Sequence, residues 1–320
     1  MKESCLRVYL LTLLSIIIIT ATVAASDNLV VHFLNVGQGD SILIQFAGKN
    51  ALIDGGDSYS GSKVSSYLKS NGVKKIDLII ATHSHPDHVG GLQTILNTFE
   101  VGQAIDGGEA PASKIYDAYL DLIAKKKIVH NIAEAGQMID FDSAVKIEVL
   151  SPIAHFDNPD DNSVILRVTY GNISFLFMGD AGFGPEKRLL NSSFNLKSDI
   201  LKVGNHGSDK STSSEFLSKV KPRVAIIEVG KYNVYGYPSQ KTLSALQSVG
   251  SKIYRTDSDG DIVVTTDGMA YSVATQKTSE NAGPNTKSIE HISKSSSTLK
   301  AATSNEFQDF SVPNLPNAWR

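Results

Sequence analysis

Between residues 29 and 274, hydrophobic and polar positions alternate in short blocks, a pattern typical of many strands and fewer helices. Short apolar or alternating segments bounded by turn residues predict strands at Leu29–Val36, Ser41–Phe46, Asn50–Ile53, Leu78–Ala81, Val101–Ile105, Lys146–Leu150, Ser163–Tyr170, Ile173–Met178, Ile200–Val203, Val224–Val229, Lys252–Arg255, Asp261–Thr266 and Ala270–Val273. Apolar residues at helical spacing predict helices at Gly61–Ser70, His88–Thr98, Ser113–Lys126, Gly184–Leu190, Ser213–Val220 and Gln240–Val249. Many strands mixed with surface helices favour two packed sheets with helices outside, in one layered domain.

The two ends of the chain differ from this central region. Residues 1–25 carry basic residues and then an apolar run that ends in small residues, which is typical of a signal peptide cleaved before Ser26. A retained membrane anchor is the alternative, because about 18 apolar residues can just span a bilayer. Both interpretations predict a secreted or otherwise extracytoplasmic protein, with membrane contact only through this segment if it stays uncleaved. Residues 275–320 are rich in Ser, Lys and Asn and are expected to form a flexible tail, with an interaction segment near 307–319 as the alternative.

Charge and cysteine content narrow the functional classes. The 320 residues carry a formal net charge of −3, so the chain lacks the broad basic surface of a protein that binds duplex DNA tightly. A nucleic acid held briefly at a metal site remains compatible with this charge. Cys5 is the single cysteine, and it precedes the apolar run, so the mature chain would depend on its hydrophobic core and not on disulfides for stability.

The densest chemical signal is His-Ser-His-Pro-Asp-His at residues 83–88, directly after an apolar run. Imidazole and carboxylate groups are ligands that suit zinc and its first-row neighbours. His83 and His85 lie two positions apart, so on an extended chain both rings face the same way. After the proline, Asp87 and His88 can face a second metal. A polar loop that happens to be rich in histidine is the alternative, although three of the chain's eight histidines fall here.

Three further polar residues follow predicted strands and have glycine neighbours. Asp54 could orient a ligand histidine from behind, or it could cap a turn. Asp180 could bridge two cations, or it could be an ordinary turn residue. His206 could be a metal ligand, or an exposed loop histidine.

Residues near these positions could contact a substrate or support the site. Lys202 and Ser208 could meet an anionic substrate. Tyr237 belongs to an aromatic loop at residues 231–238 that could stack on a base, a sugar or a choline-like head group, or simply pack against the protein. Asp40 ends a glycine-rich turn, and its carboxylate is expected to hydrogen-bond to the wall of the site.

Taken together and in order, these motifs resemble the metallo-β-lactamase superfamily, and within it the hydrolase domain of the ComEC/Rec2 competence proteins and their stand-alone secreted relatives. The resemblance covers about residues 30–264 and implies an α+β fold, a four-layer αββα sandwich within residues 26–274, with a metal site at one edge of the two sheets. The segments that carry the resemblance are 31–41, 52–56, 83–91, 162–163, 179–180, 202–208, 233–238 and 254–257.

The resemblance also implies a set of ligands. His83 and His85 would hold the first metal, and Asp87 and His88 the second. Asp180 would bridge the two metals, and His206 would complete one coordination sphere. Asp40, Asp54 and Asn162 are expected to support these ligands without binding the metal themselves. The implied cofactor is a divalent metal, zinc in the first instance, with up to two ions per chain; manganese and iron are alternatives.

Three departures from the family pattern affect this expectation. The superfamily usually has a histidine between the two halves of the site, where this chain has Asn162 and Ser163. Related chains commonly read His-His-Gly-Ser where this one has Asn205 before His206, and Tyr-Gly-His-Pro where this one has Tyr237. If either lost histidine normally holds the second metal, that metal would bind weakly or not at all.

The resulting hypothesis is a metal-dependent phosphodiesterase or nuclease in which a metal-bound hydroxide attacks phosphorus. Asp87 would take or steer the proton, while Lys202, Ser208 or Tyr237 would assist the anionic transition state. DNA or another phosphodiester is the expected anionic substrate. The alternatives are a different ester hydrolase, of phosphorylcholine type, and a non-catalytic surface-binding module with a degenerate metal site. Metal content separates the last alternative from the enzymes.

Overall fold

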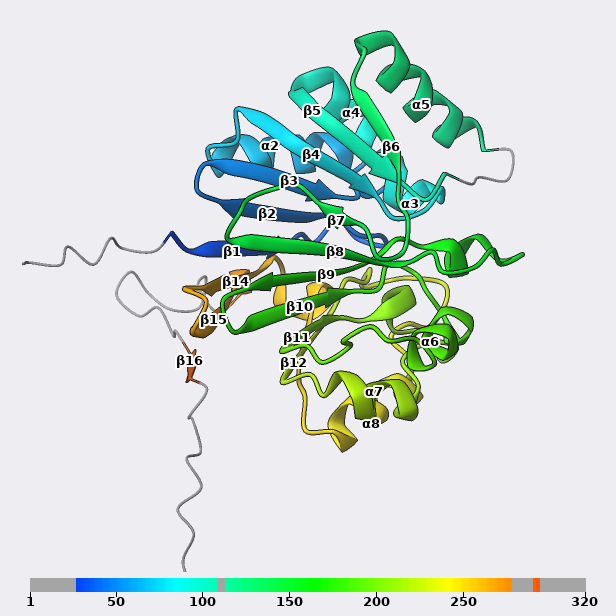
Figure 1. The fold of residues 1–320 in the computed structure, drawn as a ribbon, viewed down its shortest axis with the longest axis vertical. Coiled ribbons are helices and arrows are strands. Elements are labelled where there is room, and N and C mark those ends of the chain that lie inside the picture. The colour runs from blue at the N-terminus through cyan, green and yellow to red at the C-terminus, as the bar shows by residue number, and fades with distance from the viewer. Residues whose placement is uncertain (1–26, 109–112, 278–289, 294–320) are drawn as a thin grey trace, which may run out of the picture.

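Two mixed β-sheets pack face to face, and helices cover both outer surfaces (Figure 1). This computed structural model describes residues 27–108, 113–277 and 290–293. Helices α2, α4 and α5 lie over one sheet, while α6, α7 and α8 lie over the other. The predicted four-layer sandwich of the α+β class is therefore confirmed.

The first sheet has nine strands in the order β16-β15-β14-β1-β2-β3-β4-β5-β6. Its strands are β1 (Leu29–Phe33), β2 (Ile42–Phe46), β3 (Lys49–Ile53), β4 (Lys75–Ala81), β5 (Glu100–Asp106), β6 (Val129–Ile132), β14 (Ile262–Thr266), β15 (Ala270–Thr275) and β16 (Glu290–Ser293). The pairs β3–β4, β4–β5 and β5–β6 are parallel, and the other pairs of this sheet are antiparallel.

The second sheet has seven strands in the order β13-β12-β11-β10-β9-β8-β7. Its strands are β7 (Met138–Ile139), β8 (Val145–Ser151), β9 (Ile165–Tyr170), β10 (Ile173–Phe177), β11 (Ile200–Lys202), β12 (Val224–Ile227) and β13 (Lys252–Arg255). From β10 to β13 the strands run parallel. Both sheets thus have a parallel half, and loops at the carboxyl ends of parallel strands are common places for binding sites.

The predicted helices lie at their expected positions with one exception, and one short helix, Thr256–Asp259, was not predicted. They are α2 (Gly61–Ser70), α3 (Pro86–Val89), α4 (Leu92–Thr98), α5 (Lys114–Lys126), α6 (Phe183–Leu190), α7 (Ser214–Val220), α8 (Gln240–Ser248) and α9 (Thr256–Asp259), with 3₁₀ turns η1 (Pro159–Asn162) and η2 (Gly204–Gly207). Ser113 and Ser213, predicted as the first helical residues, cap α5 and α7 instead, since their hydroxyls accept hydrogen bonds from Tyr116 N and Phe216 N.

The exception is the helix predicted over His88–Thr98, which the structure divides into α3 and α4 at Gly90 and Gly91. The division places α3 tightly against the end of β3. Gly91 N donates to Gly56 O at 2.9 Å, and a Cβ at Gly91 would lie 1.9 Å from Gly55 O. Only glycine permits this approach, which fixes the position of the short helix that follows His83 and His85.

Three strands were not predicted. The strand β6 is exposed and β7 has two residues, so neither carries a strong apolar pattern. The third, β16, lies inside the segment expected to be a flexible tail and pairs with β15. The rest of that tail beyond residue 277, like the predicted signal peptide or anchor, lies outside the described residues. Among the residues that are described, no helix has the length and apolar character required to cross a bilayer.

The main core lies between the sheets. Phe33 on β1 and Phe177 on β10 face each other across the interface with ring centroids 6.1 Å apart, and Phe175 stacks on Phe177 at 6.0 Å. All three belong to one buried cluster that contains side chains from both sheets. Two further clusters lie under the outer helices. The three clusters match the three interfaces of a four-layer sandwich.

We expect Phe175→Ala to lower the free energy of unfolding by about 3–5 kcal/mol, because it removes a fully buried ring between the two sheets. Val234→Ala is the matched control. This side chain is 91% exposed, so its loss should change the free energy by less than about 0.5 kcal/mol. Urea unfolding of the metal-free protein measures both. A loss below about 1 kcal/mol for Phe175→Ala would contradict this packing of the sheets.

Candidate metal centre

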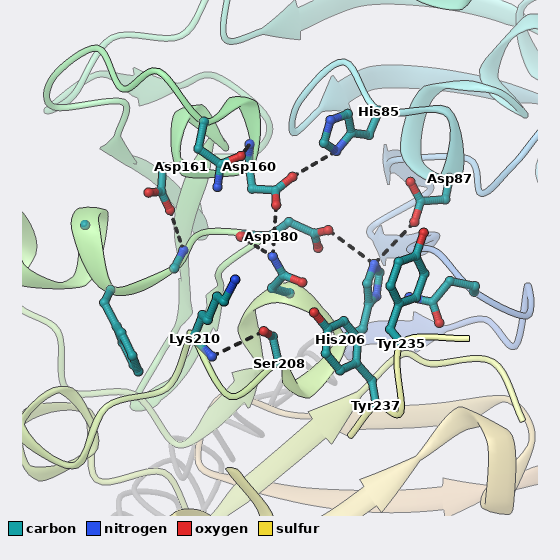
Figure 2. Close-up of a pocket in the computed structure, with 16 residues that line it drawn as sticks. His85, Asp87, Asp160, Asp161, Asp180, His206, Ser208, Lys210, Tyr235 and Tyr237 are labelled. Atoms are coloured by element: carbon teal, nitrogen blue, oxygen red, sulfur yellow. Dashed lines mark hydrogen bonds and ion pairs between the residues drawn. The ribbon is translucent and has the colours of Figure 1, made fainter. Parts of the chain in front are cut away.

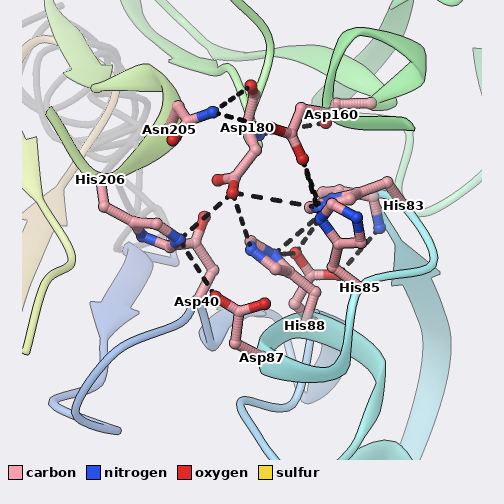
Figure 3. Close-up of polar contacts among 12 residues, drawn as sticks. Asp40, His83, His85, Asp87, His88, Asp160, Asp180, Asn205 and His206 are labelled. Atoms are coloured by element: carbon pink, nitrogen blue, oxygen red, sulfur yellow. Dashed lines mark hydrogen bonds and ion pairs between the residues drawn. The ribbon is translucent and has the colours of Figure 1, made fainter. Parts of the chain in front are cut away.

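Ligand-type side chains from four loops meet at one edge of the sandwich (Figure 3). His83 and His85 follow β4, and Asp180 follows β10. His206 lies in η2 after β11, while Asp160 lies in η1 before β9. Residues separated by up to 123 positions therefore become neighbours because both sheets present their strand ends at the same edge.

The first group consists of His83, His85 and Asp160, which offer ligand atoms within 4.8 Å of one another. His85 Nδ1 lies 2.8 Å from Asp160 Oδ1, and His83 Nε2 lies 3.7 Å from the same oxygen. His83 Nε2 also lies 4.0 Å from Asp180 Oδ2. Two imidazoles and two carboxylates thus surround one point.

The second group consists of Asp87, His88 and His206. His206 Nε2 lies 3.5 Å from Asp87 Oδ2 and 3.2 Å from Asp180 Oδ2. His88 Nε2 lies 3.4 Å from the same oxygen of Asp180. Asp180 therefore faces both groups, which is the position that a bridging carboxylate requires.

Hydrogen bonds behind the histidines set the direction in which their ring nitrogens point. His88 Nδ1 lies 2.8 Å from Asp54 Oδ2, so donation to this buried carboxylate leaves His88 Nε2 as an acceptor. Thr82 Oγ1 donates to Asp54 at 2.6 Å and lies 3.1 Å from His83 Nδ1. Asp54 thus orients two histidines, one directly and one through Thr82.

His206 is oriented in the same way by a different group. Its Nδ1 lies 2.9 Å from the backbone oxygen of Glu228, to which it donates. His206 and the preceding Asn205 both have positive φ values, 48° and 46°. This conformation is sparsely populated for residues with a side chain, and it recurs at functional sites where the surrounding structure enforces it.

The donor atoms fit a divalent metal. The Nε2 atoms of His83, His88 and His206 and the Oδ1 atom of Asp180 are buried without a hydrogen-bond partner among the described residues. Buried polar groups are normally paired, so atoms that converge unpaired indicate a missing positive partner. Burial opposes ionisation of Asp180, but when His206 and His88 are protonated their charges outweigh it and hold the pKa of Asp180 well below its usual range. A bound cation would take the place of these ring protons. The clusters can therefore bind divalent metals.

Asp40 lies behind His206 and is paired with Lys202. Asp40 Oδ1 is 3.4 Å from His206 Nδ1, and Asp40 Oδ2 is 2.6 Å from Lys202 Nζ. Lys202 is 1% exposed, so the expected contact between this lysine and an anionic substrate is wrong. Its ammonium compensates the buried Asp40 carboxylate instead. The glycine-rich turn before Asp40 packs on the metal-binding loop, since a Cβ at Gly39 would lie 2.1 Å from Asp87 O.

Asn162 does not take the place expected for it. Its side-chain amide accepts from Phe156 N at 2.9 Å and donates to Phe156 O at 2.8 Å, so it closes the loop and contacts none of the ligand groups. Asp160, two residues earlier, points into the site instead. The sequence analysis missed Asp160, although the acidic run around it was a usable signal.

The replacement of histidine by Asn205 is related to the use of Asp160. Asn205 Nδ2 donates to Asp160 Oδ2 at 3.1 Å and to Asp180 O at 3.2 Å. An amide at this position can therefore hold a carboxylate that faces His83 and His85. The missing histidine near residue 162 and the replacement of histidine by Asn205 thus belong to one arrangement of polar contacts around Asp160.

A solvent-open cavity of about 690 Å³ lies beside the ligand groups (Figure 2). Among the residues that line it are Asp87, Ser208 and Tyr237, three of the four side chains expected to act in catalysis. Lys210 lines the cavity where Lys202 was expected to act. This volume lies in the range of about 300–1,000 Å³ that small-molecule sites commonly show.

Comparison with known proteins gives a consistent result. A family model described as the metallo-β-lactamase superfamily matches residues 34–230. ComE operon protein 3 of Bacillus subtilis is 31% identical over 251 residues, which cover 72% of this chain and 32% of that protein. Recombination protein 2 of Haemophilus influenzae is 31% identical over 242 residues, which cover 73% of this chain and 28% of that protein. The chain thus spans about a third of the length of these relatives.

Solved structures agree on the fold. The crystal structure of a metallo-β-lactamase fold protein from Bacillus subtilis aligns with a TM-score of 0.51 at 13% identity and covers 74% of this chain and 100% of that one. At this identity the likeness concerns the fold alone.

The matched segment, residues 34–230, contains both groups of ligand-type side chains and Asp180 between them. The family assignment therefore does not depend on the His83–His88 motif alone, because the sandwich, the sheet-edge position of the site and the similarity over most of the chain agree with it. The chain belongs to the metallo-β-lactamase superfamily and is related to bacterial competence proteins.

Proposed function

We propose that this chain is an extracytoplasmic metal-dependent hydrolase that cleaves phosphodiesters, with a nucleic acid strand as the substrate. The observation that carries the proposal is the pair of ligand groups that share Asp180 at the edge of an open cavity. The extracytoplasmic location rests on the apolar N-terminal run of the sequence.

The residues present can be assigned to two metal positions. His83, His85 and Asp160 would hold one cation, Asp87, His88 and His206 would hold the other, and Asp180 would contact both. Zinc is the first candidate, because the donors are imidazole and carboxylate without thiolate, and manganese and iron use the same donors. Two such cations lower the pKa of water towards neutrality and stabilise negative charge on a phosphoryl group.

Side chains of the cavity wall would handle the proton and the substrate. Burial opposes ionisation of Asp87, but the neighbouring imidazoles of His206 and His88 hold its pKa well below the usual range. Asp87 is therefore ionised at neutral pH, and its carboxylate can steer the proton of an attacking water by accepting a hydrogen bond from it. Ser208 and Tyr237 carry hydroxyls that can donate to anionic oxygens in the same cavity.

Phosphodiester chemistry is favoured over other ester hydrolysis by the relatives. One of them is named a recombination protein and another a competence protein, which favours a nucleic acid. Because the chain spans about a third of these proteins, their names support the proposal without deciding it.

Two other functions have specific observations in their favour. A phosphorylcholine-type ester hydrolase is favoured by the tyrosines at the cavity, since aromatic rings bind quaternary ammonium groups. A surface-binding module with a degenerate metal site is favoured by the histidine replacements at Asn205 and Tyr237. Against that module, Asp160 supplies a ligand-type carboxylate beside His83 and His85.

We expect the protein from Ser26 onward to contain about two divalent ions per chain and to hydrolyse bis-p-nitrophenyl phosphate. Asp160→Ala should reduce the content to about one ion and lower turnover by at least about 100-fold, because it removes a ligand of the first position. Asp157→Ala, an exposed change in the same loop, is the control and should alter neither value. Mass spectrometry gives the metal content. One ion or none in the wild type, with no turnover, would favour the binding module.

Asp54→Asn should weaken metal binding by about 10- to 100-fold, the usual effect of removing a group that orients a ligand histidine. In the wild type Oδ2 accepts from both His88 Nδ1 and Thr82 Oγ1, and Oδ1 accepts from Thr82 N. Asparagine has one carbonyl oxygen, so its NH₂ group must face one of these two sets of donors and that set loses its acceptor. Competition with a chromophoric chelator measures the affinity. Asp140→Asn, at an exposed aspartate remote from the site, serves as the control. An unchanged affinity for Asp54→Asn would show that Asp54 does not orient His88.

A further inference from the structure

Aromatic side chains lie on two walls of the cavity beside the ligand groups. Tyr235 and Tyr237 form one wall, with ring centroids 5.5 Å apart and planes inclined by 18°. Because Tyr237 supports only one face of the outer ring and Tyr235 is 63% exposed, the outer ring has surface available for another planar group. The pair is therefore shaped as a stacking platform.

The loop that carries this platform is held by its own hydrogen bonds. Asn233 Nδ2 donates to Gly230 O at 2.8 Å and to Tyr237 O at 2.7 Å, and Tyr237 N donates to Asn233 Oδ1 at 2.9 Å. An exposed aromatic side chain on an ordered loop loses little further entropy when it binds. The hydrogen bonds of the loop thus keep Tyr235 at the cavity although its side chain is exposed.

The second wall is formed by Phe183, which is 40% exposed. Phe183 N donates to Lys210 O at 3.0 Å, so its backbone adjoins Lys210, which with Asp161 marks one side of the cavity in Figure 2. Lys241 Nζ lies 5.3 Å from the ring centroid. Figure 2 places Asp180 and His206 between this wall and the wall of Tyr235 and Tyr237.

The charged side chains that line the cavity limit the ways in which it can bind a polyanion. Asp87, Asp160, Asp161 and Asp180 line the cavity, and Lys210 is the one lysine or arginine among the lining residues that the structure describes. Phosphates can therefore bind at the cations but not along a basic groove. Stacking of bases, which tolerates any sequence, can supply the remaining affinity.

We propose that Tyr235 and Phe183 are base-stacking subsites on opposite sides of the scissile phosphate, and that the enzyme therefore acts on unpaired strands. This inference rests on the proposed phosphodiesterase function. In a duplex the faces of the bases are covered by their neighbours, so a platform of this kind requires bases that are single-stranded or flipped out.

The test compares two single-stranded oligonucleotides of equal length, an oligothymidylate and the corresponding abasic chain, which carry the same phosphates. We expect the wild type to have at least a tenfold lower KM for the oligothymidylate. Tyr235→Ala or Phe183→Ala should remove most of that preference, whereas Tyr235→Phe should retain it because the ring remains.

Tyr232→Ala is the matched control. This tyrosine lies in the same loop and is 86% exposed but does not line the cavity, so the preference should stay unchanged.

Equilibrium binding separates the platform from catalysis. Fluorescence anisotropy with the Asp180→Asn variant, in which turnover should be lost, measures affinity for the same two oligonucleotides. Tighter binding of the oligothymidylate by about tenfold supports the platform, and loss of that difference in an added Tyr235→Ala change supports it further.

Other outcomes overturn the inference or the function separately. Equal cleavage and equal binding of the two oligonucleotides, with bis-p-nitrophenyl phosphate still hydrolysed, would overturn the platform and leave the phosphodiesterase standing. If no phosphodiester is cleaved, the proposed function fails, and the binding comparison alone decides the platform. Hydrolysis of p-nitrophenyl phosphorylcholine, together with equal binding of the oligonucleotides, would overturn the platform in favour of a choline-type ester. Equal cleavage of duplex and single strand would contradict the requirement for unpaired bases.

Discussion

Four buried polar atoms that converge without a hydrogen-bond partner in the described part of the chain are the constraint on which the rest of this site depends. They are the Nε2 atoms of His83, His88 and His206 and the Oδ1 atom of Asp180. A buried polar group left unpaired costs about 1–3 kcal/mol, so the fold would not keep four of them together without a compensating partner. A divalent cation would provide that partner. The stability of this edge and its chemistry are therefore linked.

The groups behind these atoms explain why they converge. Asp54 accepts from His88 and Thr82 and adopts a positive φ of 56°, a conformation that aspartate tolerates better than most residues. Its backbone continues into Gly55, whose N–H donates to His88 O at 2.7 Å. Side chain and backbone of one turn thus hold the same histidine from two directions. The close approach at Gly91 completes the contact between this turn and α3.

The departures from the family pattern acquire a physical meaning in this setting. Asn205 holds Asp160, and Asp160 faces His83 and His85, so a carboxylate stands beside these histidines in a chain that has Asn162 and Ser163 in place of the usual histidine. A carboxylate adds negative charge, which favours harder cations relative to an all-histidine site. Tyr237 adds an aromatic surface in place of the third histidine and supports Tyr235. These replacements remove histidines from the site and would alter both its preference among metals and the surface that it offers to a substrate.

The sequence by itself determined the layered architecture, because strand and helix periods depend on local alternation of apolar and polar residues. It also determined the ligand-type side chains that lie close together in the chain or directly after strands, such as His83, His85 and Asp180. Tertiary structure alone decided the rest. Lysine is a residue type that commonly contacts anionic substrates, but only the packing of the two sheets shows that Lys202 is buried against Asp40. Asp160 and Asn162 are two residues apart in one polar loop, and only the path of that loop decides which of them faces the histidines, since residue type does not specify the direction of a side chain outside regular structure.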